Sequence, residues 1–178
     1  MPLSMDEIAK LQVSPAVKAE INEVPVQGWY IAKPFYNIVD TIPEDRQYNP
    51  GRPFINVGVA LHHENEDGSC GRKAGKAFFR MSPQQALNQK GNPDLQTKLY
   101  AACAKALGCS EVVDMVTQIE EGVSFKVRGS DVYREEKYGD ITFPQDDDHR
   151  AELQSTMPVS EFMVLDIRFY DEPETTPF

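Results

Sequence analysis

The sequence predicts a mainly β protein in which one or two helices are inserted between strands. Several segments alternate apolar and polar residues, as expected for strands that bury one face; the clearest are 53–63 and 122–129. One long segment, 93–108, carries an apolar stripe at helical spacing. Hydrophobic residues make up 40% of the 178 residues, enough for one packed core, so we expect a single domain with extensions.

The first third of the chain is predicted to hold an arm and two strands. Residues 1–23 form an N-terminal arm in which Ser4 and Glu7 have the spacing of a helix capping box. The segment 24–42 is rich in β-branched and aromatic residues but contains a glycine and a proline, so we expect a long strand with a bend or bulge. After a loop rich in turn formers, the strand 53–63 directs every second side chain to the core, namely Ile55, Val57, Val59 and Leu61.

The remaining elements are predicted in the same way. The strand 76–82 pairs with the preceding strand as a hairpin whose tip, 64–75, is long, polar and glycine-rich. Asn92 is predicted to cap the helix and Gly108 to end it. The segment 130–140 is predicted to be a turn or loop. A shorter helix is expected over 110–120, strands over 122–129, 141–143 and 160–170, and a charged connection over 145–158. The last strand is expected to direct to one face Met163, Leu165, Ile167 and Phe169.

Charge is distributed unevenly along the chain, whose formal net charge is −10. Residues 70–100 hold six bases and one acid, a net charge of +5, whereas 139–178 hold two bases and ten acids, a net charge of −8. An acidic tail on a basic domain is typical of interaction tails, and the alternative is that both runs are solvated faces. The three cysteines lack framework spacing, which favours a reducing, cytosolic compartment, and we expect neither a signal peptide nor a membrane span.

The outer faces of three predicted strands carry bases and aromatic rings. Phe78 lies between Lys76 and Arg80, and the flanking segments 72–76 and 131–138 also bring bases close to small or aromatic residues. Nucleic-acid bases stack on aromatic rings while lysine and arginine follow the phosphates, so this pattern predicts a surface for single strands. Two adjacent glutamates in the second flanking segment count against it. The alternative is that Phe78 packs under the helix or against a second subunit, with its basic neighbours in solvent.

The order of the predicted elements is strand, strand, strand, helix, strand, strand, with a long and bent first strand. This is the order of an OB-fold, a five-stranded Greek-key barrel with a helix between strands 3 and 4. In these features the sequence resembles the single-stranded DNA-binding proteins of tailed bacteriophages, which are OB-folds with acidic C-terminal tails. The resemblance covers 24–144 and the end of the chain. It is carried by GWY…PFY, the PFINVGVAL and KAFFRMS hairpin, PDLQTKLYAACAKALG and the tail YDEPETTPF, which matches an acidic run closed by Pro-Phe.

The resemblance implies that a domain over 24–170 binds single-stranded DNA without sequence preference, in phage DNA replication, recombination or repair, in the host cell cytoplasm. From the residues we expect no catalytic activity, no cofactor and no membrane, and the resemblance implies a homodimer or cooperative assembly on DNA. The tail, 171–178, is expected to recruit replication or recombination enzymes and to compete with DNA, through Asp171, Glu172, Glu174, Pro177 and Phe178. With the strand faces and loops, it predicts DNA contacts from Trp29, Tyr30, Lys33, Phe54, Asn56, Arg72, Lys73, Lys76, Phe78, Arg80, Lys126, Arg128, Tyr133, Arg134, Lys137 and Tyr138.

Other classes of function find weaker support in the residues. A protein-interaction or assembly module with an OB-like barrel and no nucleic-acid role would bury the outer aromatics in a subunit interface. A zinc site would draw on His62, His63 and Cys70, but no CxxC or HxxxH spacing occurs. The acids of 146–150 are interpreted as a solvated loop rather than a hydrolase metal site. No nucleophile motif or P-loop is present that would indicate an enzyme.

Overall fold

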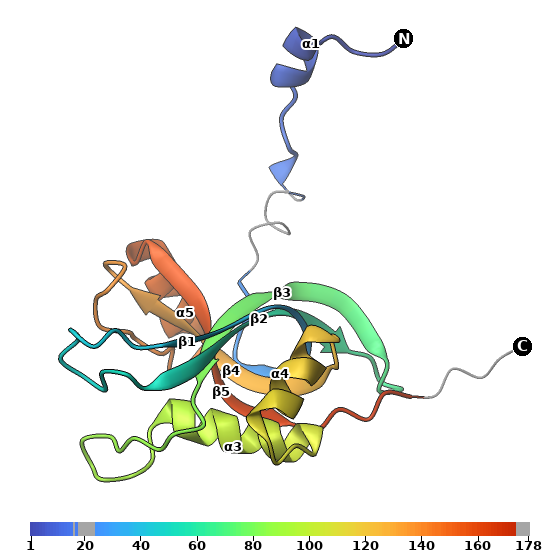
Figure 1. Ribbon diagram of the computed structural model, residues 1–178. Helices are drawn as coiled ribbons and strands as arrows, with labels where there is room; N and C mark the ends of the chain where they lie inside the picture. Colours follow the sequence, from blue (N-terminus) through green and yellow to red (C-terminus); the bar gives the residue numbers. More distant parts are fainter. Residues whose placement is uncertain (16, 18–23, 174–178) are drawn as a thin grey trace, which may run out of the picture.

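The computed structural model describes residues 1–15, 17 and 24–173. Its described strands form one antiparallel sheet in the order β3-β2-β1-β4-β5 (Figure 1). They are β1 (Gly28–Thr41), β2 (Pro53–Glu64), β3 (Cys70–Met81), β4 (Phe125–Arg134) and β5 (Val159–Arg168). The helices are α1 (Met5–Ala9), α3 (Leu95–Leu107), α4 (Val112–Glu120) and α5 (Asp147–Thr156). The prediction of a mainly β protein with helices between the third and fourth strands is therefore confirmed.

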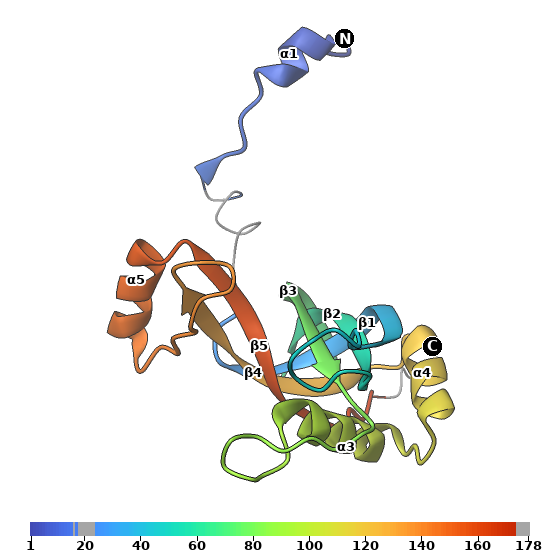
Figure 2. The ribbon, with the colours of Figure 1, turned by 60° about the vertical axis from the view of Figure 1, so that its left-hand side comes forward.

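The core lies between the inner face of the sheet and the two helices α3 and α4 (Figures 1 and 2). The predicted inward face of β2 is confirmed, because Ile55, Val57, Val59 and Leu61 are all fully buried. Helix α3 packs against β3 and β5, and α4 packs against β1. Strands β3 and β5 are the two edges of the sheet, yet they lie against each other, so the sheet is curled.

Helix α3 begins two residues later than predicted. Its N-cap is Asp94, whose carboxylate accepts a hydrogen bond from the Thr97 backbone N–H at 3.0 Å. The same carboxylate pairs with the buried guanidinium of Arg52, with Nη1 and Oδ2 2.7 Å apart. The hydrogen bonds from Arg52, joined by those from Thr97, hold the pKa of Asp94 at about 2 despite its partial burial. An ion pair thus fixes the cap, which Asn92 cannot replace, while Gly108 ends the helix in the left-handed conformation as predicted.

Several boundaries differ from the sequence prediction. Strand β3 starts at Cys70, so the basic segment 72–76 belongs to a strand and not to a flexible tip. Strand β4 continues to Arg134, and the expected strand at 141–143 is reduced to an isolated bridge between Thr142 and Tyr133. The expected charged connection over 145–158 contains helix α5.

An irregularity in β5 reverses the predicted faces of the last strand. Arg128 pairs with Asp166 and Gly129 with Val164, so Leu165 is an extra residue in the ladder. Alternation is therefore interrupted, and the side chains that reach the core are Phe162, Val164 and Ile167. The prediction for this strand was correct only at Ile167.

Helix α5 and the ends of β4 and β5 form a small lobe beside the main core (Figure 2). Its centre is the fully buried carboxylate of Asp131, which accepts hydrogen bonds from Arg150 Nε at 2.6 Å and from the Tyr133 hydroxyl at 2.8 Å. It also accepts one from the backbone N–H of Gln27, just before β1. This network ties α5 and the start of the sheet to β4.

The N-terminal arm is separate from the core in its described part. The capping box predicted from Ser4 and Glu7 is confirmed at the start of α1. Every described residue of the arm, 1–15 and 17, is exposed. No helix in the described ranges is both long and apolar enough to cross a membrane.

Candidate nucleic-acid interface

Three aromatic side chains gather on the outer face of the sheet, in what we call the aromatic cluster (Phe35, Tyr36 and Phe78). They are 56%, 38% and 51% exposed, which is high for large rings. The ring of Phe78 meets those of Phe35 and Tyr36 edge to face, with centroids 5.7 and 6.1 Å away. The cluster stands over Gly58 of β2, where an added Cβ would lie 2.7 Å from the Phe78 ring.

A bulge in β1 explains how two consecutive residues reach one face. The register between β1 and β2 shifts between Pro34 and Tyr36, so Phe35 is the extra residue. The long strand with a bulge was predicted, but its consequence for the aromatic residues was not. The missed signal is the PFY triplet, in which two rings follow a proline, a residue that within a sheet marks an edge strand or a bulge.

Bases flank the aromatic cluster in cross-strand rows. Lys33, Ala60 and Lys76 are paired across β1, β2 and β3, as are Tyr36, Gly58 and Phe78 in the next row. Ile38, Asn56 and Arg80 make the third row. The middle strand therefore supplies small or short side chains, and the bases and rings stand on either side of it.

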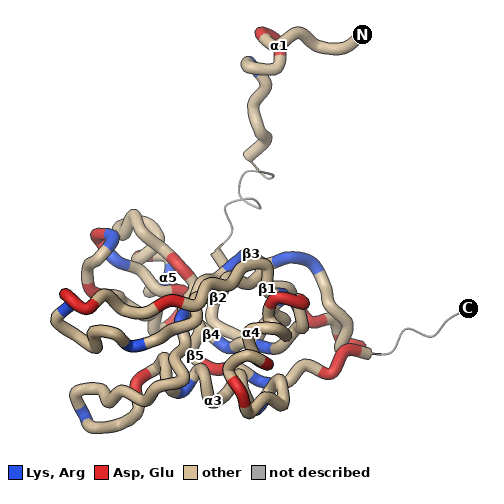
Figure 3. The backbone as a smooth tube through the Cα atoms, in the orientation of Figure 1, with Lys and Arg blue, Asp and Glu red and all other residues tan. Residues whose placement is uncertain are grey.

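On β3 the exposed side chains Lys73, Lys76, Phe78 and Arg80 form what we call the β3 track. Figure 3 shows the stretches of Lys and Arg along this strand in blue. Lys73 lines the same hollow as Lys76 although their spacing is odd, because the ladder pairs His62 with Lys73 and Leu61 with Gly75 and leaves Ala74 as a bulge. At about 3.3 Å per residue the track is about 23 Å long. This length suits several nucleotides of an extended strand.

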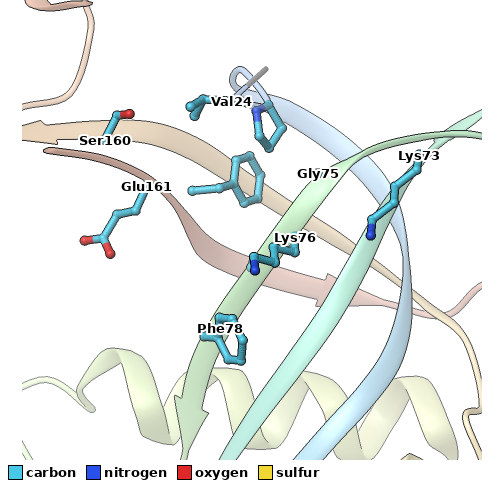
Figure 4. A pocket seen from close by; sticks show the side chains of 10 residues that line it. Val24, Lys73, Gly75, Lys76, Phe78, Ser160 and Glu161 are labelled. Atoms are coloured by element: carbon cyan, nitrogen blue, oxygen red, sulfur yellow. The ribbon is translucent and has the colours of Figure 1, made fainter. Parts of the chain in front are cut away.

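One hollow opens along the β3 track and another at its Arg80 end. The first, of about 490 Å³, lies between Lys73, Lys76 and Phe78 of β3 and Ser160 and Glu161 of β5 (Figure 4).

The other hollow, of about 630 Å³, lies under the β1–β2 loop, where Arg46 and the exposed Tyr48 approach Arg80 and Phe54. These two loop residues were missed by the sequence analysis, which treated 43–53 only as a turn-rich loop. The signal was the RQY triplet, a base next to an aromatic ring.

Three of the predicted stacking residues have no open ring face. Phe54, Tyr30 and Tyr133 are only 8%, 5% and 1% exposed, which corrects the expectation that they lie on open faces or in a loop. The Phe54 ring is covered by the Arg80 guanidinium, 4.3 Å from its centroid. Tyr30 donates a hydrogen bond to the carbonyl of Val26, and Tyr133 belongs to the Asp131 network. Trp29 is half-buried, with the Arg168 guanidinium 4.5 Å from its ring centroid.

The predicted bases of β4 lie apart from the β3 track. Lys126 Nζ pairs with the Glu64 carboxylate at 2.7 Å, and Arg134 pairs with Glu161. Arg128 is half-buried. Lys126 and Arg128 are three ladder positions from β3, about 14 Å along the sheet. Arg134 lies nearer, because its partner Glu161 lines the same hollow as Lys73 and Lys76.

The connection after β4 carries a net negative charge, which repels phosphate. Residues 135–161 hold eight acids and two bases. Lys137 and Tyr138, which were predicted to bind DNA, are exposed there, with the ammonium 5.5 Å from the ring centroid. We call this region, with α5, the acidic lobe. In the strand order the lobe belongs to the β4–β5 edge, but β5 contacts β3, and Glu161 of the lobe lines the hollow beside Lys73 and Lys76.

The remaining predicted residues fall in two groups. Asp171 and Glu172 are exposed beyond β5, whereas Glu174, Pro177 and Phe178 lie outside the described residues.

His62 Nδ1 lies 3.0 Å from the Gly71 carbonyl oxygen, and among the described residues no group of three or more His, Cys, Asp or Glu could hold a metal ion.

The arrangement combines exposed rings of β1 and β3, which can stack on bases, with exposed cations along β3, which can pair with phosphates. Arg72, also exposed, continues the row of bases toward the start of β3. Comparisons of this chain with protein-family models, curated proteins and solved structures gave no match.

Proposed function

We propose that this chain binds single-stranded DNA without sequence preference, with the strand lying along the β3 track and across the aromatic cluster. The observation that carries the proposal is the row of Lys76, Phe78 and Arg80, all exposed on one strand, with two further rings beside it. Rings that stack on any base and cations that follow the backbone give affinity without reading sequence.

The fold supports the same proposal. We infer an OB-fold, because the strand order β3-β2-β1-β4-β5, the contact of β3 with β5 and the helix after β3 agree with a five-stranded barrel of that type. In OB-folds the second and third strands and the loop between strands 1 and 2 bind oligonucleotides. Here those parts are the β3 track and the hollow beneath Arg46 and Tyr48.

The biological setting follows as part of the proposal. A protein of this kind would protect single strands during phage-type replication, recombination or repair. Its C-terminal tail would recruit enzymes of those processes, and it would work as a homodimer or a cooperative assembly. We assign it no catalytic activity, in keeping with a site of rings and cations rather than of nucleophiles.

A titration of fluorescein-labelled oligo-dT at two salt concentrations tests the proposal. If Lys33, Lys73, Lys76 and Arg80 each neutralise one phosphate, log K should fall with log salt with a slope of about −3. Changing Lys73, Lys76 and Arg80 together to glutamine should weaken binding and leave a slope near −1. A matched control is the double variant K10Q/K90Q, which removes two exposed lysines outside the β3 track and should bind as the unmodified chain does. Absence of binding at low salt would refute the proposal.

One observation favours a second candidate, a protein-interaction or assembly module. Ile38 and Val39, beside the aromatic cluster, are also exposed, and together with the rings they extend an apolar patch along β1. If this patch is a subunit interface, replacing Phe35, Tyr36 or Phe78 by alanine should change the oligomeric state in sedimentation. The unmodified chain should then show no binding of oligo-dT.

A further inference from the structure

A further basic hollow lies between α3 and the end of β5, and we call it the α3–β5 hollow. Its volume is about 470 Å³, and it shares no lining residue with the two hollows described beside the β3 track. The alanines Ala101, Ala102 and Ala106 of α3 leave the space open, and Ile167 closes one side. Phe169 lies at its edge with 65% of its surface exposed. Its lining is therefore apolar at the centre.

Cations border this apolar centre. Lys98 and Lys105 are seven residues apart on α3, which places them on one face about 10 Å apart along the helix. Arg168 of β5 also lines the hollow, with its guanidinium over the Trp29 ring, and the single acid in the lining is Asp166. The Arg168 and Asp166 side chains are 3.9 Å apart, at the limit of an ion pair. The lining carries three bases and one acid, so it is suited to an acidic peptide with one large apolar side chain.

The chain itself contains a segment of that chemistry. Residues 171–178 read DEPETTPF and hold three acids, two prolines and one phenylalanine. Within one molecule, the part of the segment that is described leads away from the hollow. The Tyr170 hydroxyl donates a hydrogen bond to the Gly68 carbonyl at 2.8 Å, and Pro173 lies against Gly68 at the tip of the β2–β3 hairpin.

We propose that the α3–β5 hollow binds the C-terminal segment 171–178 of a second copy of the chain. The acids pair with Lys98, Lys105 and Arg168, and the phenylalanine packs over the alanines beside Phe169. Because the donated segment and the receiving hollow are different surfaces, the contact is head-to-tail and extends copies into a row.

The contact is weak in free solution and strong on a shared strand. Exposed ion pairs and one apolar side chain give a dissociation constant on the order of 0.1–1 mM. For copies held side by side on one DNA strand, the effective concentration of one around the next is on the order of mM, which is enough to populate such a contact. This role in aligning copies depends on the proposed DNA binding, but the contact itself does not.

The test uses the full chain, labelled with ¹⁵N, and the acetylated peptide DEPETTPF as the probe, without DNA. Titration to about 2 mM is expected to shift the amide signals of 98–106 and 167–169 in a saturable manner. K98E/K105E should weaken the binding at least 10-fold. Ala101→Phe, which fills the hollow at an exposed position without changing charge, should do the same and covers the case in which the charge reversal disturbs folding.

Two matched controls locate the site. The peptide NQPQTTPF, which lacks the acids, should bind at least 10-fold more weakly, and the triple glutamine variant of the β3 track should bind the acidic peptide normally. Sedimentation of the full chain should show a concentration-dependent increase in size that K98E/K105E removes. Shifts confined to the β3 track, no saturable shift, or a monomer at every concentration would each overturn the proposal. Failure of the oligo-dT titration leaves these outcomes unaffected.

Discussion

Removing the ring of Phe78 is the most direct test of the aromatic cluster. The side chain is about half exposed and touches Phe35 and Tyr36 edge to face, so its outer face is open to a stacked base. Stacking of one base on one ring is worth about 1–3 kcal/mol, so Phe78→Ala should raise the dissociation constant for oligo-dT about 5- to 150-fold. Loss of the half-buried ring should lower the free energy of unfolding by only about 1 kcal/mol.

The assay is fluorescence anisotropy of labelled oligo-dT at fixed salt, with urea unfolding of each variant in parallel. Phe78→Tyr keeps a ring and should bind within about twofold of the unmodified chain. Tyr138→Ala is the matched control, because that ring is 89% exposed but lies in the acidic lobe, and its removal should leave affinity unchanged. Equal losses in the Phe78→Ala and Tyr138→Ala variants, or no loss in the first, would show that the cluster is not where bases stack.

Three other predictions concern the supports of the fold and site. Gly58→Ala places a Cβ 2.7 Å from the Phe78 ring and should displace it, weakening oligo-dT binding several-fold in the same anisotropy assay; unchanged affinity would count against the cluster. The folded pKa of Asp94, about 2, lies below its ordinary value of 3.8, so about 2 kcal/mol of stability is present above pH 4 and lost as pH falls through 2. Urea unfolding from pH 6 to pH 2 should show this fall, and Asp94→Asn should remove that part of it. Arg150→Met leaves the buried Asp131 carboxylate without its cation and should cost about 3–5 kcal/mol in urea unfolding, whereas a loss below 1 kcal/mol would mean that the network is not essential.

The sequence predicted correctly those parts of the fold in which apolar and polar residues alternate without interruption. The buried alternation from Ile55 to Leu61 and the exposed row of Lys76, Phe78 and Arg80 are both observed. Each lies in a stretch of strand where the ladder has no bulge, so alternate side chains point to opposite faces. Bulges are different, because one extra residue changes the face of every side chain beyond it. Nothing in the alternation of 160–170 shows that Leu165 is such a residue.

Helix α5 was missed for another reason. Leu153 is its only fully buried residue, so its sequence has almost no apolar stripe to detect. The available signal was the cap, since Asp146 accepts a hydrogen bond from the backbone N–H of His149 as acidic residues do at helix starts. A row of acids was interpreted as a solvated loop, whereas acids at the first turn also stabilise a helix through its dipole.

The candidate site could be predicted only where exposure follows from strand alternation. Phe78 was identified in this way, whereas Phe54 has the same alternation but is closed by a base from the neighbouring strand. Tyr133 was predicted to lie in an open loop. In the structure β4 continues through it, and its hydroxyl donates a hydrogen bond to the buried Asp131 carboxylate. Such closures depend on pairs of residues far apart in sequence, so one sequence without the ladder register does not contain them.

The formal charge of −10 does not oppose binding along the β3 track, because the fold separates the charges. At physiological ionic strength the screening length is about 8 Å, so exposed acids more than one screening length from the β3 track act weakly on phosphates there. Two acids lie closer: Glu161 lines hollows beside both Lys76 and Arg80, and Asp40 lines the hollow beneath Arg46 and Tyr48. At 10 mM salt the screening length grows to about 30 Å, and the whole acidic lobe then repels the strand. Affinity should consequently rise less steeply at low salt than four phosphate contacts alone require.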